Sequence, residues 1–543
     1  MTVTEDRPDT AEAGGAPPPL TEPLGTDAGG GPLPALRNRL VPPMPRTGPG
    51  WWLALLGVTM LGGLLRFVHL ARPHAFVFDE TYYAKDAWSL LNFGVERSYP
   101  AQGADASILA GNTRIWTDAP SFVVHPPLGK WMIALGEAVF GMNPLGWRVV
   151  PALCGTIAIF VLGRLVRRLT RSDLLGVLAA LLLAVDGLAI VEARTAILDS
   201  LLAFWLLLAT AALLIDRDRM RGRLADAVSA DPSATGRGGP RAGWRPWRLV
   251  AGLCFGAACA TKWNGVFLLA VFGLMVVLWD AGARRAIGVR RSWWAALRLD
   301  AVPAFLSLVG TAVVVYVVSW TGWFASSRGY DRPWGLTNPP SGVGRLFPTA
   351  LRSWWHYHAE MLSFNTGLTT PHPYESNPIG WLLMVKPVAF AYTGKLSGDG
   401  CANNCTQAIH ALGTPLLWWG GCVALLICAW LWLAGRDWRA GLALAGVVGT
   451  WVPWLFFAKR TIFSFYAIAT LPFLIIAVVL VIGTVIGRPG ERSGRWRALA
   501  AALCGVYVVL VVLDAGFMYP VLTDALIPYD SWRSRMWFAS WID

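Results

Sequence analysis

The chain has 543 residues, of which 55% are hydrophobic and only 15% are charged, and its mean hydropathy is +0.48. Soluble proteins carry about a quarter charged residues, so this composition excludes an ordinary soluble fold and indicates a polytopic membrane protein. The net charge of +13 does not indicate nucleic-acid binding, because the basic residues lie in short segments between apolar runs rather than in a separate domain.

The N-terminal residues 1–50 are polar and rich in Gly, Pro and Thr, a composition that predicts a disordered tail. They contain no apolar stretch of the kind found in a cleavable signal peptide. The first long apolar run, at 51–70, is therefore expected to act as the insertion signal. We expect residues 51–543 to form one transmembrane domain.

Apolar runs of about 17–25 residues are long enough to cross the hydrocarbon core of a bilayer. Eleven such runs predict an all-α polytopic membrane fold: 51–70, 146–163, 174–191, 196–215, 248–261, 264–280, 301–324, 414–434, 441–458, 464–486 and 498–518. The region 248–280 is the least regular, because the polar motif TKWNG (261–265) interrupts it. A tight hairpin between two spans is favoured there over one long helix.

The arginines predict the orientation. If the N-terminal tail is cytoplasmic, the short Arg-rich segments all fall on the cytoplasmic side, beside anionic headgroups: 164–171, 217–248, 284–298, 436–439 and 488–497. Joining 248–280 into one helix would destroy this pattern. The outer side then receives the long loops 71–145 and 325–413 and the C-terminal tail 519–543. All six lysines fall on that outer side.

Two adjacent carboxylates, Asp79 and Glu80, stand in the outer motif FVFDETYYAKD (76–86), just after the first span. Alone, such a pair is most simply a solvated turn. The motif HPPLGKW (125–131) follows in the same loop and supplies His125 and Lys130. After it, WMIALGEAVFGM is amphipathic and too short to span, so we expect it to lie along the membrane interface and to hold these cations at headgroup depth.

More cationic side chains are predicted at the same depth on the same side. They are Arg148 at the second span, Arg194 in EARTAILDS (192–200), Lys262 in TKWNG, and Lys459 with Arg460 in FFAKRTIFSFY (456–466). Each alone could be a snorkelling anchor. Because several surround one carboxylate pair, and interfacial charges are costly, together they indicate a site for a phosphate.

A carboxylate beside a phosphate site suits glycosyl transfer from a polyprenyl-phosphate sugar. The carboxylate would act as a general base on an acceptor hydroxyl. Fixed cations would stabilise the departing lipid phosphate. One base opposite one leaving group predicts inversion at the anomeric carbon, as in single-displacement glycosidases.

The motifs FDETYYAKDA (78–87), HPPLGKW, WRVVPALCGT (147–156), EARTAILDS and TKWNG, in this order, resemble the protein O-mannosyltransferase family, most closely its actinobacterial-type members. The resemblance implies a GT-C type fold. It also implies transfer of mannose from polyprenyl-phosphate mannose to Ser or Thr of exported proteins at the outer face of the plasma membrane. The secretion translocon is a candidate partner. The β-trefoil MIR domain of eukaryotic members is not expected, because 325–413 is too short for it.

The resemblance also suggests roles for the residues. Asp79 would be the catalytic base, Glu80 would help to position the acceptor, and Arg148 would be functionally important. Binding of the lipid phosphate is expected from the cations as a set: His125, Lys130, Arg148, Arg194, Lys262, Lys459 and Arg460. No metal ligands are predicted, and the need for a divalent metal stays open.

Two other functions are compatible with parts of this pattern. A related GT-C enzyme could glycosylate a lipid or a cell-wall glycan from a polyprenyl-phosphate sugar, but HPPLGKW together with TKWNG favours the protein-mannosylating branch. A proton-coupled transporter could use Asp79 or Asp186 as a relay. The sequence shows neither the internal repeat nor the paired broken helices with acidic residues that transporters carry.

The second outer loop contains two further features. Cys401 and Cys405 in CANNC predict a small disulfide if the loop faces an oxidising compartment, with a thiol metal or redox site as the alternative. WWHYHAEMLSFNTG (354–367) is predicted either to shape an acceptor groove or to be a plain interfacial helix.

Overall fold

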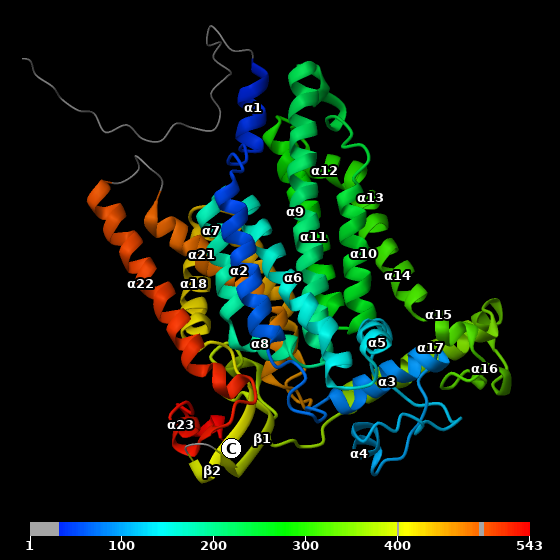
Figure 1. The fold of residues 1–543 in the computed structure, drawn as a ribbon. Coiled ribbons are helices and arrows are strands. Elements are labelled where there is room, and N and C mark those ends of the chain that lie inside the picture. The colour runs from blue at the N-terminus through cyan, green and yellow to red at the C-terminus, as the bar shows by residue number, and fades with distance from the viewer. Residues whose placement is uncertain (1–31, 399–400, 488–492, 543) are drawn as a thin grey trace, which may run out of the picture.

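The computed structural model describes residues 32–398, 401–487 and 493–542. In these residues, long helices run side by side, and short helices and a small sheet gather at one end of the bundle (Figure 1). The long helices of the bundle include α2 (Pro49–Phe67), α6 (Pro144–Thr170), α9 (Leu198–Ala230), α11 (Gly265–Ala286), α18 (Pro415–Leu433) and α22 (Gly494–Met518). Their buried apolar side chains form one large core cluster with α21 (Leu471–Ile486).

Every predicted span coincides with helix. By length and composition, eight helices in the described residues can cross a membrane, or nine if α7 (Asp173–Val185) and α8 (Gly187–Ala193), bent by 62° at Asp186, are one span. The remaining predicted spans correspond to α21 and to α10 (Pro246–Thr261), which have 16 residues each. The membrane architecture is confirmed, whereas the count of eleven stays a prediction.

Two spans are built from consecutive helical pieces. The pieces of the first are α12 (Ser292–Ala296), α13 (Val302–Phe305) and α14 (Thr311–Ser319), joined by the π-helical turns η2 (Leu297–Ala301) and η3 (Leu306–Gly310). The second consists of α19 (Trp438–Thr450) and α20 (Val452–Phe456). Between α10 and α11 the chain turns back at TKWNG, so the predicted hairpin is present. A Cβ on Gly265 would come within 3.0 Å of the Ala258 backbone, so the turn requires glycine.

Part of the N-terminal segment that was predicted to be a disordered tail forms a helix. Helix α1 (Pro32–Leu40) packs against α9, and Leu40 is buried against Met220 and Leu224. The prediction of disorder is therefore wrong for residues 32–50, because a few apolar side chains find a partner helix. Residues 1–31 of the predicted tail lie outside the described residues.

The Arg-rich segments meet at the end of the bundle that carries α1. Arg168 and Arg171 both pair with Asp218, at 3.0 and 2.9 Å. The Arg217 guanidinium lies 3.3 Å from the ring centre of Trp438. These contacts join three of the predicted segments on one side. Part of the last segment, residues 488–492, lies outside the described residues.

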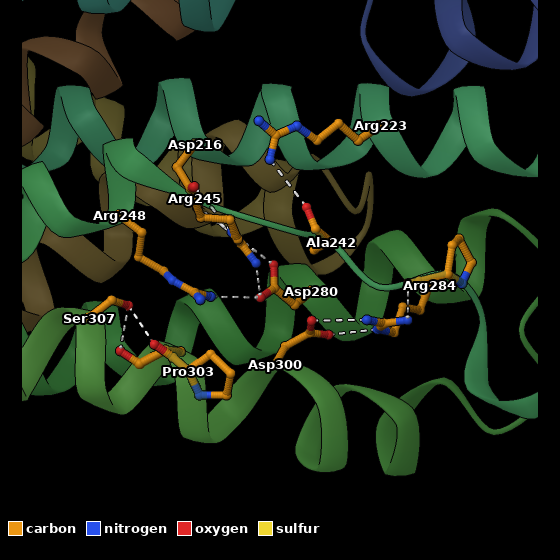
Figure 2. Close-up of polar contacts among 12 residues, drawn as sticks. Asp216, Arg223, Ala242, Arg245, Arg248, Asp280, Arg284, Asp300, Pro303 and Ser307 are labelled. Carbon is orange, nitrogen blue, oxygen red and sulfur yellow. Dashed lines mark hydrogen bonds and ion pairs between the residues drawn. The ribbon is translucent and has the colours of Figure 1, made fainter.

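Figure 2 shows how aspartates neutralise part of this Arg-rich end. Arg245 bridges Asp216 of α9 and Asp280 of α11, with an Nη1–Oδ2 distance of 2.6 Å to Asp280. Arg284 pairs with Asp300 through its Nε at 2.6 Å. Since these arginines are buried and paired with aspartates of neighbouring segments, they join helix ends to one another.

The opposite end carries the predicted outer loops. Its helices are α3 (Glu80–Phe93), α4 (Ala104–Leu109), α5 (Leu128–Phe140), α15 (Thr321–Ala325), α16 (Trp334–Thr337), α17 (Thr349–Gly367) and α23 (Tyr529–Arg533). Short 3-10 turns complete the chain: η1 (Pro232–Gly238), η4 (Gly342–Leu346), η5 (Pro378–Gly380), η6 (Ser464–Ala469), η7 (Tyr519–Leu522) and η8 (Ala539–Trp541). Helix α5 exposes Leu135, Val139 and Phe140 on one face, as expected of an interfacial helix.

A small sheet, absent from the all-α prediction, lies at the same end. The strands β1 (Val388–Gly398) and β2 (Cys401–Ala411) pair antiparallel, and β3 (Ile527–Pro528) of the C-terminal segment pairs with β2. A disulfide joins Cys401 to Cys405 where β2 begins. The sheet therefore ties the C-terminal segment to the second outer loop.

Candidate active site

The two adjacent carboxylates stand at the start of α3 and have different surroundings. The main-chain carbonyl of Asp79 accepts hydrogen bonds from the backbone N–H groups of Tyr82 and Tyr83, at 3.0 and 3.1 Å, which begins the helix. Phe78, just before it, has a positive φ of 50°. This turn sends Glu80 into the protein interior and leaves Asp79 half-buried.

Glu80 is fully buried and paired with Arg148 of α6. Its two oxygens accept from Nε and Nη2 of Arg148, both at 2.7 Å. They also accept from the backbone N–H groups of Val77 and Ala196, both at 2.9 Å. Glu80 therefore joins α3 to α6 and to the turn before α9.

All the hydrogen-bond donors of Arg148 are used in contacts around Glu80 and the segment before it. Besides Glu80 it donates to the backbone carbonyls of Leu70, Pro73 and Ala75, at 3.3, 3.0 and 2.8 Å. Every N–H of the guanidinium is then used within the protein. The contacts fix the segment that leads to Asp79, and no donor of Arg148 is left for a phosphate.

Asp79 lies beside a lysine that is already neutralised. Lys262, in the α10–α11 turn, holds both oxygens of Asp199, at 2.8 and 2.7 Å. Burial raises the pKa of Asp79 to about 6, with the charge of Lys262 opposing the rise and that of Asp199 adding to it. A hydrogen bond from Tyr83 lowers the pKa slightly. Asp79 is therefore ionised at neutral pH and is a stronger base than an ordinary carboxylate.

Positive groups converge on His125, which is half-buried beside Tyr83. The pKa of His125 lies well below its usual value, first because of burial and then because of the charges of Lys262, Lys130 and Arg460. A group surrounded in this way stays neutral at physiological pH and can donate or accept a hydrogen bond. The surroundings would favour an anion.

Arg460 is a cation of this site that keeps an N–H donor unpaired among the described residues. Its Nη2 donates to Asn365 Oδ1 of α17 at 3.0 Å, while its buried Nε has no hydrogen-bond partner in the described part of the chain. Among the described residues no carboxylate forms an ion pair with it. A buried donor without a partner is costly, so this guanidinium is suited to a bound anionic group.

Aromatic rings form a wall beside Asp79. Phe78 stacks on Phe390 of β1 with ring centres 4.8 Å apart, and meets Phe463 and Phe465 edge-on. Tyr466 lies under the Lys262 ammonium, 4.1 Å from its ring centre. The segment from Arg460 to Tyr466 thus brings a cation and aromatic faces to one place.

Four predicted residues come together: Asp79, His125, Lys262 and Arg460. The remaining predicted residues are engaged differently: Glu80 and Arg148 form the neighbouring buried pair, and Lys130 acts on His125 through its charge. Arg194 donates to main-chain carbonyls at the end of α2, among them Val68 at 2.7 Å. Lys130 pairs with Glu96, and with Asp86 at 3.7 Å. Lys459 is exposed.

Sequence reasoning missed Tyr83, Asp199, Tyr466 and Asn365 as members of this site. Tyr83 stands four residues after Asp79, the spacing of one helical turn, so its proximity was readable from the motif. Asp199 lies within EARTAILDS, but its pairing with Lys262 joins residues 63 positions apart. Asn365 and Arg460 are 95 positions apart, and no local pattern links them.

Comparison with known proteins gives consistent relatives. Residues 57–325 match the model of the dolichyl-phosphate-mannose-protein mannosyltransferases, and residues 350–541 match the C-terminal four-transmembrane region of protein O-mannosyltransferases. A polyprenol-phosphate-mannose–protein mannosyltransferase of Mycobacterium tuberculosis is 38% identical over 503 residues, covering 90% of this chain and 92% of the relative. One from Corynebacterium glutamicum is 34% identical, covering 86% and 88%.

A solved structure shares the fold. The protein O-mannosyltransferase Pmt1-Pmt2 complex of S. cerevisiae, bound to the sugar donor, has a TM-score of 0.69 to this chain. The sequence identity is 12%, and the match covers 94% of each chain. The architecture of helices and outer segments is therefore of the GT-C type that the motifs indicate.

Proposed function

The chain belongs to the protein O-mannosyltransferase family, and from this membership we propose how the Asp79 site carries out mannosyl transfer. The enzyme takes mannose from polyprenyl-phosphate mannose. The acceptor is the hydroxyl of a Ser or Thr in an exported protein. Supporting an outer location, the site lies at the end of the bundle opposite the Arg-rich segments (Figure 1), and the positive-inside rule assigns those to the cytoplasm of a plasma-membrane protein.

Asp79 is the general base. Its carboxylate takes the proton of the acceptor hydroxyl while that oxygen bonds to C1 of mannose, and the C1–O bond to the phosphate breaks with its electrons leaving on the phosphate oxygen. Attack opposite the leaving group inverts the anomeric carbon. The observation that carries this role is the half-buried carboxylate with a pKa of about 6, placed beside a cation that Asp199 already neutralises.

The leaving phosphate is bound chiefly by Arg460, whose Nε has no hydrogen-bond partner among the residues that the structure describes, with His125 as a neutral hydrogen-bonding group. Lys262 contributes its charge from beside Asp79. Arg148 and Arg194 act as positioning residues, because their donors hold main-chain carbonyls and Glu80. This revises the expectation that all the outer cations contact the phosphate.

The test is Asp79→Asn in the full-length protein, reconstituted with polyprenyl-phosphate mannose and a Ser/Thr-rich peptide. Asn keeps the shape but cannot accept the proton, so transfer should fall about 10²–10⁴-fold, the usual contribution of a general base. Donor binding should persist. Asp118→Asn, at an exposed aspartate of the same outer loop, is the control. Near-normal transfer by Asp79→Asn would remove Asp79 from this role, and label in lipid rather than peptide would point to a different acceptor.

A further inference from the structure

A second polar cluster lies in the outer loop 325–413, on different residues from the Asp79 site. Asp331 stands between α15 and α16, and His356 and Glu360 stand one turn apart on α17. One ligand-type atom from each lies within 4.8 Å of the other two. His356 Nδ1 is 3.4 Å from Asp331 Oδ2. Because residues at i and i+4 share a helix face, α17 presents two of these groups to Asp331.

The atoms that converge have no hydrogen-bond partners. Among the described residues, the buried atoms Asp331 Oδ2, His356 Nδ1 and Glu360 Oε2 accept or donate no hydrogen bond, although Nδ1 and Oδ2 lie within ion-pair distance of each other. The imidazole packs against Trp334 with ring centres 4.1 Å apart, which fixes its orientation. Two carboxylates brought together repel one another and lose hydration, and the single imidazole nitrogen that faces them can offer at most one N–H. Such an arrangement is satisfied by a cation.

We propose that Asp331, His356 and Glu360 bind a divalent metal ion, with Zn²⁺ as the best-suited probe. Imidazole nitrogen with carboxylate oxygen is a donor set that zinc accepts. These three residues offer one ligand atom each. A four-coordinate zinc ion would therefore keep one position for water or another group. The arrangement assigns no step of mannosyl transfer to the metal.

The ion would clamp the 326–334 segment to α17, and α17 contacts the catalytic region. Tyr357 exchanges hydrogen bonds with the backbone of Val123, both at 3.1 Å, just before the HPPLGKW motif. Farther along α17, Asn365 holds Arg460. The metal would therefore stabilise the helix that orients Arg460, a consequence that rests on the proposed function, whereas metal binding itself does not.

The test uses the full-length, tag-free protein in detergent, stripped with a chelator and dialysed against Zn²⁺. Bound metal is measured by mass spectrometry, and melting is followed with and without Zn²⁺. The double variant Asp331→Asn/Glu360→Gln keeps side-chain shape, and Asn tolerates the positive φ of 55° at position 331. His356→Ala is a second, independent variant. Asp118→Asn is the matched control, because it removes one exposed acidic group that pairs with Arg97 and Arg328 and is not a member of the cluster.

We expect the wild type and Asp118→Asn to bind about one Zn²⁺ per chain more than either cluster variant. The Zn²⁺-dependent rise in melting temperature should be lost in the cluster variants. Equal zinc content and equal melting shifts in the wild type and both cluster variants would overturn the proposal, as would a wild type that binds neither Zn²⁺ nor Mn²⁺. Asp79→Asn should bind zinc normally, so failure of the metal site and failure of the proposed base are separate results.

Discussion

The Glu80–Arg148 pair gives a sharp prediction, because it stands next to the proposed base and has a different task. In Glu80→Gln the side chain keeps its size and one acceptor oxygen but loses its charge. The Arg148 guanidinium, whose side chain is 1% exposed, is then left without its counter-charge. Asp79 keeps its chemical identity, so the substitution probes the support of the site rather than the base.

The magnitude follows from the burial of both partners. Glu80 and Arg148 have side-chain exposures of 0% and 1%, and removing one partner of a buried pair costs about 3–5 kcal/mol. Arg148 would still hold Leu70, Pro73 and Ala75 through their carbonyls, so we expect about 3 kcal/mol, near the lower end of that range. Transfer should fall because the segment before Asp79 loosens.

The assay is thermal inactivation and unfolding of the full-length protein in detergent, together with the pH dependence of transfer. Asp118→Asn is the control: Asp118 pairs with Arg97 at 3.0 Å but is 85% exposed, and such surface pairs contribute about 0–1 kcal/mol. In Glu80→Gln the residual activity should keep the acid limb of the wild type, since Asp79 is still present. If Glu80→Gln has the melting temperature and the transfer rate of the wild type, the pair does not hold the site together. If the variant strongly shifts the acid limb of the pH–rate profile, Glu80 acts in proton transfer.

Three further predictions concern the base, the phosphate site and the Cys401–Cys405 disulfide. Because the pKa of Asp79 is raised to about 6 and the ionised form is the base, kcat/KM should rise as pH increases through about 6 and then level off; a limb near pH 4 would indicate an unperturbed carboxylate. Arg460→Gln should raise the donor KM about tenfold or more, the loss of one charge-assisted hydrogen bond, whereas Lys459→Gln at the exposed neighbour should change it little, and equal effects would contradict the placement of Arg460. Replacing Cys401 and Cys405 with Ser should lower stability by about 2 kcal/mol at most, because the closed loop is short; this is measured by melting under non-reducing conditions, and an unchanged melting point would show that the disulfide does not support the fold.

Much of the fold could be predicted from local composition. Every apolar run that hydropathy marked as a span coincides with helix, since a helix in lipid satisfies its own backbone hydrogen bonds and needs only apolar side chains. The break at TKWNG marked the α10–α11 hairpin because Gly265 is required there. The order of α1 and the pairing of β3 with β2 were not predictable, since each depends on a partner far away in the chain.

For the candidate site, too, some features could be predicted from local motifs and others depend on contacts between distant segments. The motif DETYY located the carboxylates beside the membrane surface, and HPPLGKW and TKWNG located cations. The motifs did not reveal which of these charged side chains are already paired with other groups of the protein. Asp79 and Glu80 are neighbours with the same chemistry, but only Glu80 meets a buried arginine. The segment that carries His356 and Glu360 was singled out, but its approach to Asp331 was not predicted, because the loop between Asp331 and that helix has no fixed geometry in sequence.

The amino-acid sequence by itself determined that this chain is a polytopic membrane protein, where its spans lie, and which motifs gather carboxylate and cation on one side. These properties depend on composition and short spacing, which are local. Only the tertiary structure decided that Glu80 is buried against Arg148, that Asp79 has no such ion pair among the described residues, and that Arg460 rather than Arg148 has a donor left unpaired among them. Whether a charged side chain can bind a substrate depends on whether groups within a few ångströms already pair with it. In a folded chain most of those groups come from distant segments.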